Sequence, residues 1–144
     1  MITPAPTNKI DSKHARGVLN AVVEATATRP AHIVVSYPNT SYELHLIPQG
    51  PVTGEVGKRL IGTIRTKSRR IDLTQTGGRY IEPVFGKPRR MQGTVTGVEG
   101  AALVVDVSIP VLVMPGDARQ KAADFPVGSF VTFDCPEWPM FTQA

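Results

Sequence analysis

The sequence is poor in the residues that would assign it directly to a class of protein. Cys135 is the single cysteine among 144 residues, which excludes an internal disulfide and leaves no cysteine cluster for zinc. The longest apolar stretch, 108–114, contains a proline and is far shorter than the roughly 20 residues of a membrane-spanning helix. The first residues have no basic start followed by an apolar segment. We therefore expect no secretory signal, no membrane contact and a cytoplasmic protein.

Glycine and proline, in contrast, are frequent. Each occurs 13 times, a content that favours many turns but stays below that of low-complexity chains. A chain of this length fits one domain with one hydrophobic core. The first nine residues include several poor helix formers. They predict a flexible tail over 1–9, followed by a single domain over 10–144.

Apolar spacing predicts one long helix near the start of the chain. Five apolar residues fall three or four positions apart after the candidate N-cap pair Asp11-Ser12, and Arg29-Pro30 ends the pattern. These five are Ala15, Val18, Leu19, Val22 and Val23. We expect an N-terminal α-helix over about 11–28 that packs on a sheet through one apolar stripe. A second, short helix is predicted late in the chain, over 117–124.

From residue 31 onward the sequence predicts strands. Apolar and polar residues alternate, and turn residues recur roughly every 8–12 positions, which is typical of a sandwich or barrel. The first hairpin is predicted around Pro38-Asn39, and tight turns are predicted at Gly77-Gly78 and Glu99-Gly100. We predict a mainly β, single-domain barrel of about seven to nine short strands. In general architecture this arrangement resembles the oligonucleotide-binding fold.

Charge is distributed unevenly along the chain. Residues 58–90 hold ten of the sixteen basic residues and two of the twelve acidic ones, a net charge of +8, while the remainder carries −4. Hairpins at Lys67-Ser68 and Gly77-Gly78 would place alternate residues of three strands on one arginine-rich face. Positive charge and an aromatic ring are the parts that single-stranded nucleic acid binding needs.

We therefore predict a non-catalytic module that binds single-stranded RNA or DNA, with RNA favoured. Arginines would contact phosphates and the ring would stack on a base. The predicted contact residues are Arg59, Arg65, Arg69, Arg70, Arg79, Phe85, Arg89 and Arg90. A structural or protein-interaction module remains open, including a homo-oligomer in which basic and acidic surfaces of two copies meet.

Other constellations predict neither catalysis nor a metal site. The same hairpin register points Glu82 inward, but a catalytic carboxylate needs a second positioned group and none is evident. A two-residue loop at Pro38-Asn39 would place His32 opposite His45, although no cysteine or third ligand lies near in sequence. We therefore expect no enzyme activity, no metal and no cofactor.

Overall fold

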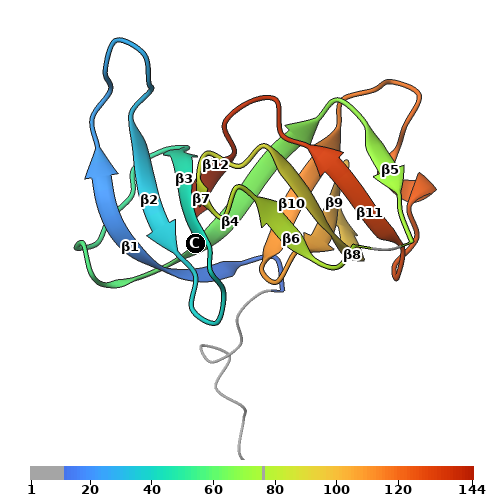
Figure 1. Ribbon diagram of the computed structural model, residues 1–144, viewed down its shortest axis with the longest axis horizontal. Helices are drawn as coiled ribbons and strands as arrows, with labels where there is room; N and C mark the ends of the chain where they lie inside the picture. Colours follow the sequence, from blue (N-terminus) through green and yellow to red (C-terminus); the bar gives the residue numbers. More distant parts are fainter. Residues whose placement is uncertain (1–11, 76) are drawn as a thin grey trace, which may run out of the picture.

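The computed structural model describes residues 12–75 and 77–144, and it is built almost entirely of strands (Figure 1). Strands hold 52% of the residues, which confirms the predicted mainly β fold. The predicted tail over 1–9 lies outside the described residues. In the part of the chain that is described, no helix has the length and apolar character needed to cross a membrane. The strands are β1 (Ala15–Val23), β2 (His32–Ser36), β3 (Glu43–Pro48), β4 (Arg59–Ser68), β5 (Ile71–Leu73), β6 (Tyr80–Glu82), β7 (Phe85–Gly86), β8 (Arg90–Glu99), β9 (Ala102–Asp106), β10 (Pro110–Pro115), β11 (Phe130–Asp134) and β12 (Met140–Gln143).

Five of these strands close into a barrel, on the left of Figure 1. Their order is β1-β2-β3-β12-β4, and β4 pairs in turn with β1. All neighbours in the barrel are antiparallel except β3 and β12. A β-bulge between Leu19 and Ala21 bends β1, whose first residues pair with β4 and whose later residues pair with β2. The predicted barrel is confirmed, although it closes with five strands and not with the predicted seven to nine.

Apolar side chains that alternate along these strands fill the barrel. Gly62 in β4 allows the closest approach of backbone and side chains, because a Cβ atom there would collide with the Phe141 ring and the Thr142 carbonyl oxygen. The resulting interior is tightly packed. Its largest buried side chains are Leu19, Ile33, Tyr37, Leu44, Leu46, Leu60, Ile64 and Phe141.

The second half of the molecule extends the sheet beyond β4. From β4 the order is β10-β9-β8-β11-β5, while β6 pairs with β8 and β7 pairs with β3. Strand β10 runs parallel to β4. Strand β5 begins three residues after β4 ends and pairs with β11, so this half curls back to the end of β4. One cluster of buried apolar side chains runs through both halves.

The predicted N-terminal helix over 11–28 is wrong, because residues 15–23 form strand β1. The spacing of four between Ala15 and Leu19 also fits a period of two, and both side chains are buried in the core. Gly17 lies between them and is buried as well. Glycine is a poor residue for a helix interior, and the three valines of this segment favour a strand.

The late helix predicted over 117–124 is reduced to a single 3-10 turn, Ala122–Asp124. Side chains in this segment bind the backbone instead. Asp117 accepts a hydrogen bond of 2.9 Å from the Arg119 N–H. The Gln120 amide binds both the N–H and the carbonyl oxygen of Ile71, at 2.9 and 2.6 Å. The bond from the Arg119 N–H competes with a helix for the same backbone group, and the two Gln120 bonds tie this segment to β5.

The hairpin predicted at Gly77-Gly78 is also wrong. Both glycines have positive φ, of 111° and 72°, so the chain turns there as expected. The flanking strands nevertheless take other partners, since β5 pairs with β11 and β6 pairs with β8. This pairing buries Ile71 and Ile81, each with 1% exposure, against longer strands.

The hairpin predicted at Lys67-Ser68 is wrong, because β5 pairs with β11 and not with β4. Ser68 Oγ lies 2.7 Å from both Asp134 Oδ1 and the Arg70 carbonyl oxygen. The Arg69 N–H also donates to Asp134 Oδ1, at 2.9 Å. These bonds direct β5 toward β11. Because neither hairpin forms, the predicted three-strand arginine face does not exist.

Two other predicted hairpins are confirmed. Strands β2 and β3 pair around the turn that contains Asn39, with Val34 opposite His45. Strands β8 and β9 pair with Glu99 opposite Ala102, so their two-residue loop falls one residue later than expected.

Candidate functional site

The eight residues predicted to contact nucleic acid are all exposed, but they lie on different parts of the molecule. Arg59 lies at the start of β4, beside β1. Arg65 and Arg69 line two hollows near the end of β4. Arg90 begins β8, where its guanidinium donates to Thr132 Oγ1 at 3.2 Å, and Arg89 precedes it.

Acidic side chains neutralise three of the predicted arginines. Arg69 Nε lies 2.9 Å from Asp134 Oδ2, and Arg70 Nε lies 2.8 Å from Asp72 Oδ1. Arg79 forms a looser pair, at 3.4 Å, with Asp106. All these arginines are at least half exposed, so the pairs contribute little to stability. They do reduce the positive field that a polyanion would meet.

Phe85 belongs to a group of four rings on the outer side of the barrel, which we call the aromatic platform: His32, His45, Phe85 and Trp138. The His32 and His45 rings stack with centroids 4.9 Å apart. Trp138 lies 5.1 Å from His32, and Phe85 meets His45 edge-on at 5.5 Å. His32 is buried, whereas Phe85 is 60% exposed. The exposed ring of Phe85 therefore packs on His45, which in turn stacks on the buried ring of His32.

Strand pairing explains how residues distant in sequence reach the platform. His32 is in β2 and His45 in β3, and their register, Ile33 opposite Leu46, makes the two histidines diagonal neighbours on one face. Phe85 arrives through β7, which pairs with β3. Trp138 lies just before β12, the other neighbour of β3.

Two cations flank these rings. Lys87 Nζ lies 5.8 Å from the centre of the Trp138 ring, within range of a cation–π contact. Arg29, in the loop between β1 and β2, lines the same hollow of about 420 Å³ as Lys87, His45, Phe85 and Trp138. This hollow combines ring faces with positive charge.

The ring of His45 remains neutral near pH 7. Burial lowers its pKa below the ordinary value of 6.5, and the charges of His32 and Arg29 lower it further, against a smaller opposing effect of Glu43. His45 Nε2 is buried and has no hydrogen-bond partner in the described part of the chain. A neutral imidazole stacks on a base without adding charge.

Trp138 connects this hollow to two more. A second hollow of about 240 Å³, over β4, β10 and β12, is lined by Trp138, Arg65 and Lys67 above apolar side chains such as Leu112 and Met140. A third, of about 220 Å³, shares Lys67 with the second and adds Arg69. We call the three adjoining hollows the Trp138 track.

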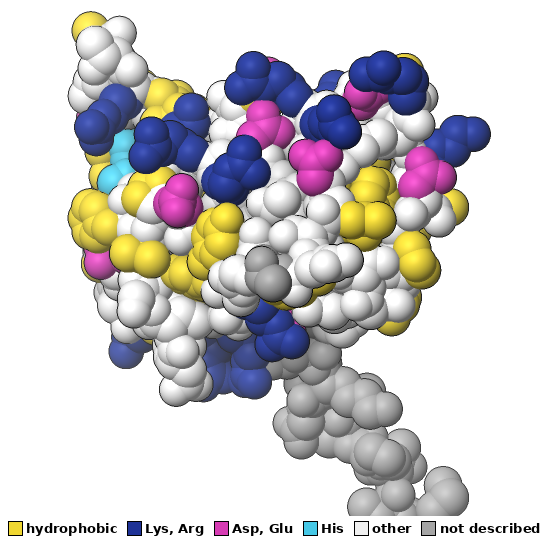
Figure 2. All heavy atoms as spheres, turned by 45° about the vertical axis from the view of Figure 1, so that its right-hand side comes forward, with side chains coloured by type: hydrophobic (Ala, Val, Ile, Leu, Met, Phe, Trp, Pro, Cys, Tyr) yellow, Lys and Arg dark blue, Asp and Glu magenta, His cyan; other side chains and the backbone are white. Residues whose placement is uncertain are grey.

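The Trp138 track has many more cations than acids. Five cationic side chains line it against one lining carboxylate, that of Glu137, although one of the five, Arg69, is paired with Asp134. Within the described residues, Arg65 and Lys67 form no ion pair. Arg65 and Lys67 lie in β4, and the other three cations lie in loops. Figure 2 shows Lys and Arg side chains along the upper part of the molecule, with Asp and Glu side chains between them. The five cations are Arg29, Lys87, Arg65, Lys67 and Arg69.

Sequence reasoning missed most of the platform. It considered His32 and His45 as a pair of metal ligands, and it did not place Trp138 near them. The sequence does contain the rings, one in β2, one in β3 and a tryptophan near the chain end. Only the strand register shows that they lie together. No group of three or more potential metal ligands occurs among the described residues.

The inward position predicted for Glu82 is wrong. Glu82 is exposed and lies opposite Arg90 in the pairing of β6 with β8. Leu73, which a hairpin at Gly77-Gly78 would place opposite Glu82, pairs instead with Val131 of β11. The carboxylate is therefore solvated and faces a cation.

No protein-family model, curated protein or solved structure matches this chain. Function therefore rests on the geometry and chemistry of the site itself.

Proposed function

We propose that the protein is a non-catalytic module that binds single-stranded nucleic acid over the aromatic platform and along the Trp138 track. The observation that carries this proposal is the cluster of partly exposed rings flanked by cations at Arg29 and Lys87. The bases of a single strand are free to stack on these rings, whereas the bases of a duplex are already paired and stacked on one another. The cations bind phosphates. A single strand uses both.

The order of the barrel strands supports this assignment. Strands β1, β2, β3, β4 and β12 are the five barrel strands in chain order. The last of them, β12, lies between β3 and β4 in the barrel. This arrangement resembles the oligonucleotide-binding fold, in which ligands bind over strands two and three and between the loops that follow strands one and four. Here the platform lies on β2 and β3, Arg29 is in the loop after β1, and Phe85 and Trp138 come from the long segment between β4 and β12.

The excess of cations favours a polyanion over a neutral ligand such as an oligosaccharide. The five cations of the track predict a salt dependence that reports their number. If all five contact phosphates of a single strand, the logarithm of the binding constant falls with the logarithm of salt at a slope of about −3.5. A neutral ligand would show almost no slope.

The proposal is tested by fluorescence anisotropy with labelled single-stranded RNA and DNA of about 15 nucleotides, at roughly 50 and 200 mM salt. We expect binding that weakens steeply with salt. Phe85→Ala removes one stacking face and weakens binding roughly 5- to 100-fold, because one base–aromatic stack contributes about 1–3 kcal/mol. Phe85 is 60% exposed, so the variant retains the core.

Leu73→Ala is the matched control, since Leu73 is a similarly exposed apolar side chain on β5, away from the platform. It leaves the affinity unchanged. No binding at low salt, or equal losses in the two variants, contradicts the proposal. Absence of binding would instead favour an acidic protein partner for the same cations.

A further inference from the structure

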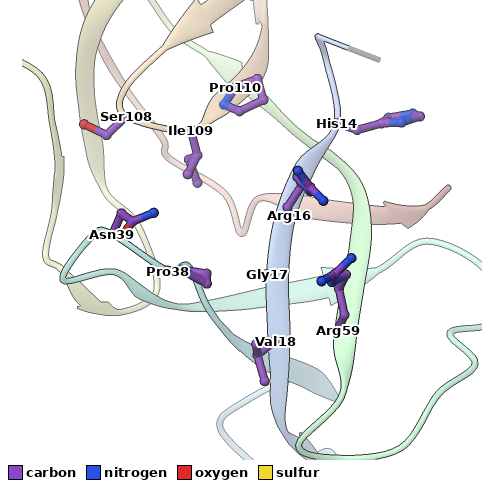
Figure 3. A pocket seen from close by; sticks show the side chains of 10 residues that line it. All are labelled: His14, Arg16, Gly17, Val18, Pro38, Asn39, Arg59, Ser108, Ile109 and Pro110. Atoms are coloured by element: carbon purple, nitrogen blue, oxygen red, sulfur yellow. The ribbon is translucent and has the colours of Figure 1, made fainter. Parts of the chain in front are cut away.

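A separate hollow lies where the barrel meets the second half of the molecule (Figure 3). It has a volume of about 470 Å³, within the range of small-molecule sites, and shares no lining residue with the Trp138 track. Its walls are the starts of β1 and β4, the turn between β2 and β3, and the turn between β9 and β10. Tyr42 holds the last turn in place, because its hydroxyl donates to the Val107 carbonyl oxygen at 2.7 Å.

Two guanidinium groups stand side by side at this hollow. Arg16 lies opposite Ile61, and Val18 lies opposite Arg59, so the two arginines are diagonal neighbours on one face of the β1–β4 pair. Figure 3 shows Arg16 and Arg59 together on adjacent strands, with His14 turned outward at the rim.

Within the described residues, no carboxylate forms an ion pair with either arginine. The residues that line the hollow include no Asp or Glu. Both side chains are exposed. Two adjacent guanidiniums without a counter-ion attract a group that carries close to two negative charges and several acceptor oxygens.

Backbone geometry at the opposite wall is unusual. Asn39 and Ser108 are the two residues other than glycine with positive φ in the described chain, at 66° and 86°, and both line this hollow. Residues with a side chain rarely adopt a positive φ, and asparagine does so more readily than serine. The Ser108 N–H donates to Asp106 Oδ1 at 2.9 Å, which fixes the turn. The wall is therefore formed in advance of any ligand.

We propose that this hollow binds a small organic phosphate, with the phosphate held by Arg16 and Arg59. A phosphate monoester carries a charge of about −1.5 to −2 at pH 7, which matches two guanidiniums. The side chain of Asn39 points toward the hollow and offers an amide to hydroxyl groups of the organic part. Pro38 and Ile109 supply an aliphatic wall for its carbon atoms. The proposal is independent of nucleic acid binding on the Trp138 track.

The test uses the whole protein with ribose 5-phosphate, ribose and inorganic phosphate as probes, followed by isothermal titration calorimetry and by backbone amide chemical shifts. We expect ribose 5-phosphate to bind at least about tenfold more tightly than inorganic phosphate, and ribose alone to bind undetectably. The largest shifts are expected at the amides of Val18, Asn39 and Ile109. Arg16→Gln with Arg59→Gln weakens the binding of ribose 5-phosphate by at least about 30-fold.

Arg119→Gln with Lys121→Gln is the matched control, because it removes the same charge from exposed residues outside the hollow. It leaves the binding of ribose 5-phosphate unchanged. Equal affinity for ribose 5-phosphate and inorganic phosphate, equal losses in both double variants, or no binding of either probe overturns the proposal. Single-stranded nucleic acid binding is measured separately with Phe85→Ala, which lies outside this hollow, so failure here is separable from failure of the proposed function.

Discussion

Two parts of one basic segment, residues 58–90, end in different electrostatic surroundings. On the second half of the molecule, Arg70 and Arg79 are held by Asp72 and Asp106. On the Trp138 track, Arg65 and Lys67 form no ion pair within the described residues. The number of charged residues in a stretch of sequence therefore does not determine the electrostatic potential at the surface that they form. The field depends on which strands bring acids to the same place.

The two parts also differ in what surrounds the charge. The cations of the track stand beside Trp138, Met140 and Leu112, which give ring and apolar surface next to the positive groups. A surface that pairs charge with rings selects for single strands, whereas charge alone selects any polyanion.

The largest expected effect comes from removing two cations of the track. Arg65→Gln with Lys67→Gln weakens binding of a labelled single strand about 50-fold at low salt and flattens the salt slope by about 1.4, because two phosphate contacts are lost. Arg70→Gln with Arg79→Gln removes the same charge from the neutralised region and changes affinity less than about threefold. Anisotropy titrations at several salt concentrations measure both values. Equal losses in the two variants would show that the two regions do not differ.

The fold was predictable where strand periodicity and turn chemistry agree. Alternation predicted the barrel, and the Glu99-Gly100 pair predicted the β8–β9 hairpin to within one residue. The first strand was mistaken for a helix because a spacing of four fits both periods, and only the sheet partners of Ala15 and Leu19 decide between them.

The site was predictable only in part. Phe85 and Arg65 were chosen from the charge of residues 58–90 and from two hairpin registers that the structure does not have, and both nevertheless line the Trp138 track. Trp138 and the two histidines were missed as partners of Phe85, because that grouping depends on β7 and β12 both joining β3. Such pairings join segments about 40 to 90 residues apart, which no local pattern reports.

A second variant removes the acidic partner of one arginine on the track, Arg69. Asp134→Asn breaks the ion pair with Arg69, which already lines the track, and we expect nucleic acid affinity to rise about threefold. The same change weakens the hydrogen bonds that fix the bend at Ser68 and lowers the free energy of unfolding by about 1–2 kcal/mol. Anisotropy and thermal unfolding measure the two effects. An unchanged affinity would mean that Arg69 reaches the ligand despite its partner.

The stability effect of Asp134→Asn depends on pH in a direction that the structure sets. Burial opposes ionisation of Asp134, but hydrogen bonds from Ser68 and Arg69 outweigh it and hold the pKa below its ordinary value of 3.8. A lowered pKa in the folded state means that the carboxylate stabilises the protein fully above 3.8, and that this contribution is lost as the pH falls through the lower folded value. The difference in Tm between wild type and variant therefore closes in acid. A difference that persists there would assign it to packing.

The smallest effect is expected from the titration of His45 on the platform. Burial, and then the charges of His32 and Arg29, lower the pKa of His45 beneath 6.5, so the ring carries no charge in neutral solution. Nucleic acid affinity should therefore stay constant, within about twofold, from pH 8 to pH 6.5, and rise only in more acidic solution, when a sixth positive charge appears at the track. His45→Gln removes that rise and leaves the plateau. Affinity that already climbs between pH 8 and pH 7 in the wild type, and not in the variant, would show that His45 belongs with the cations of the track and not with its neutral rings.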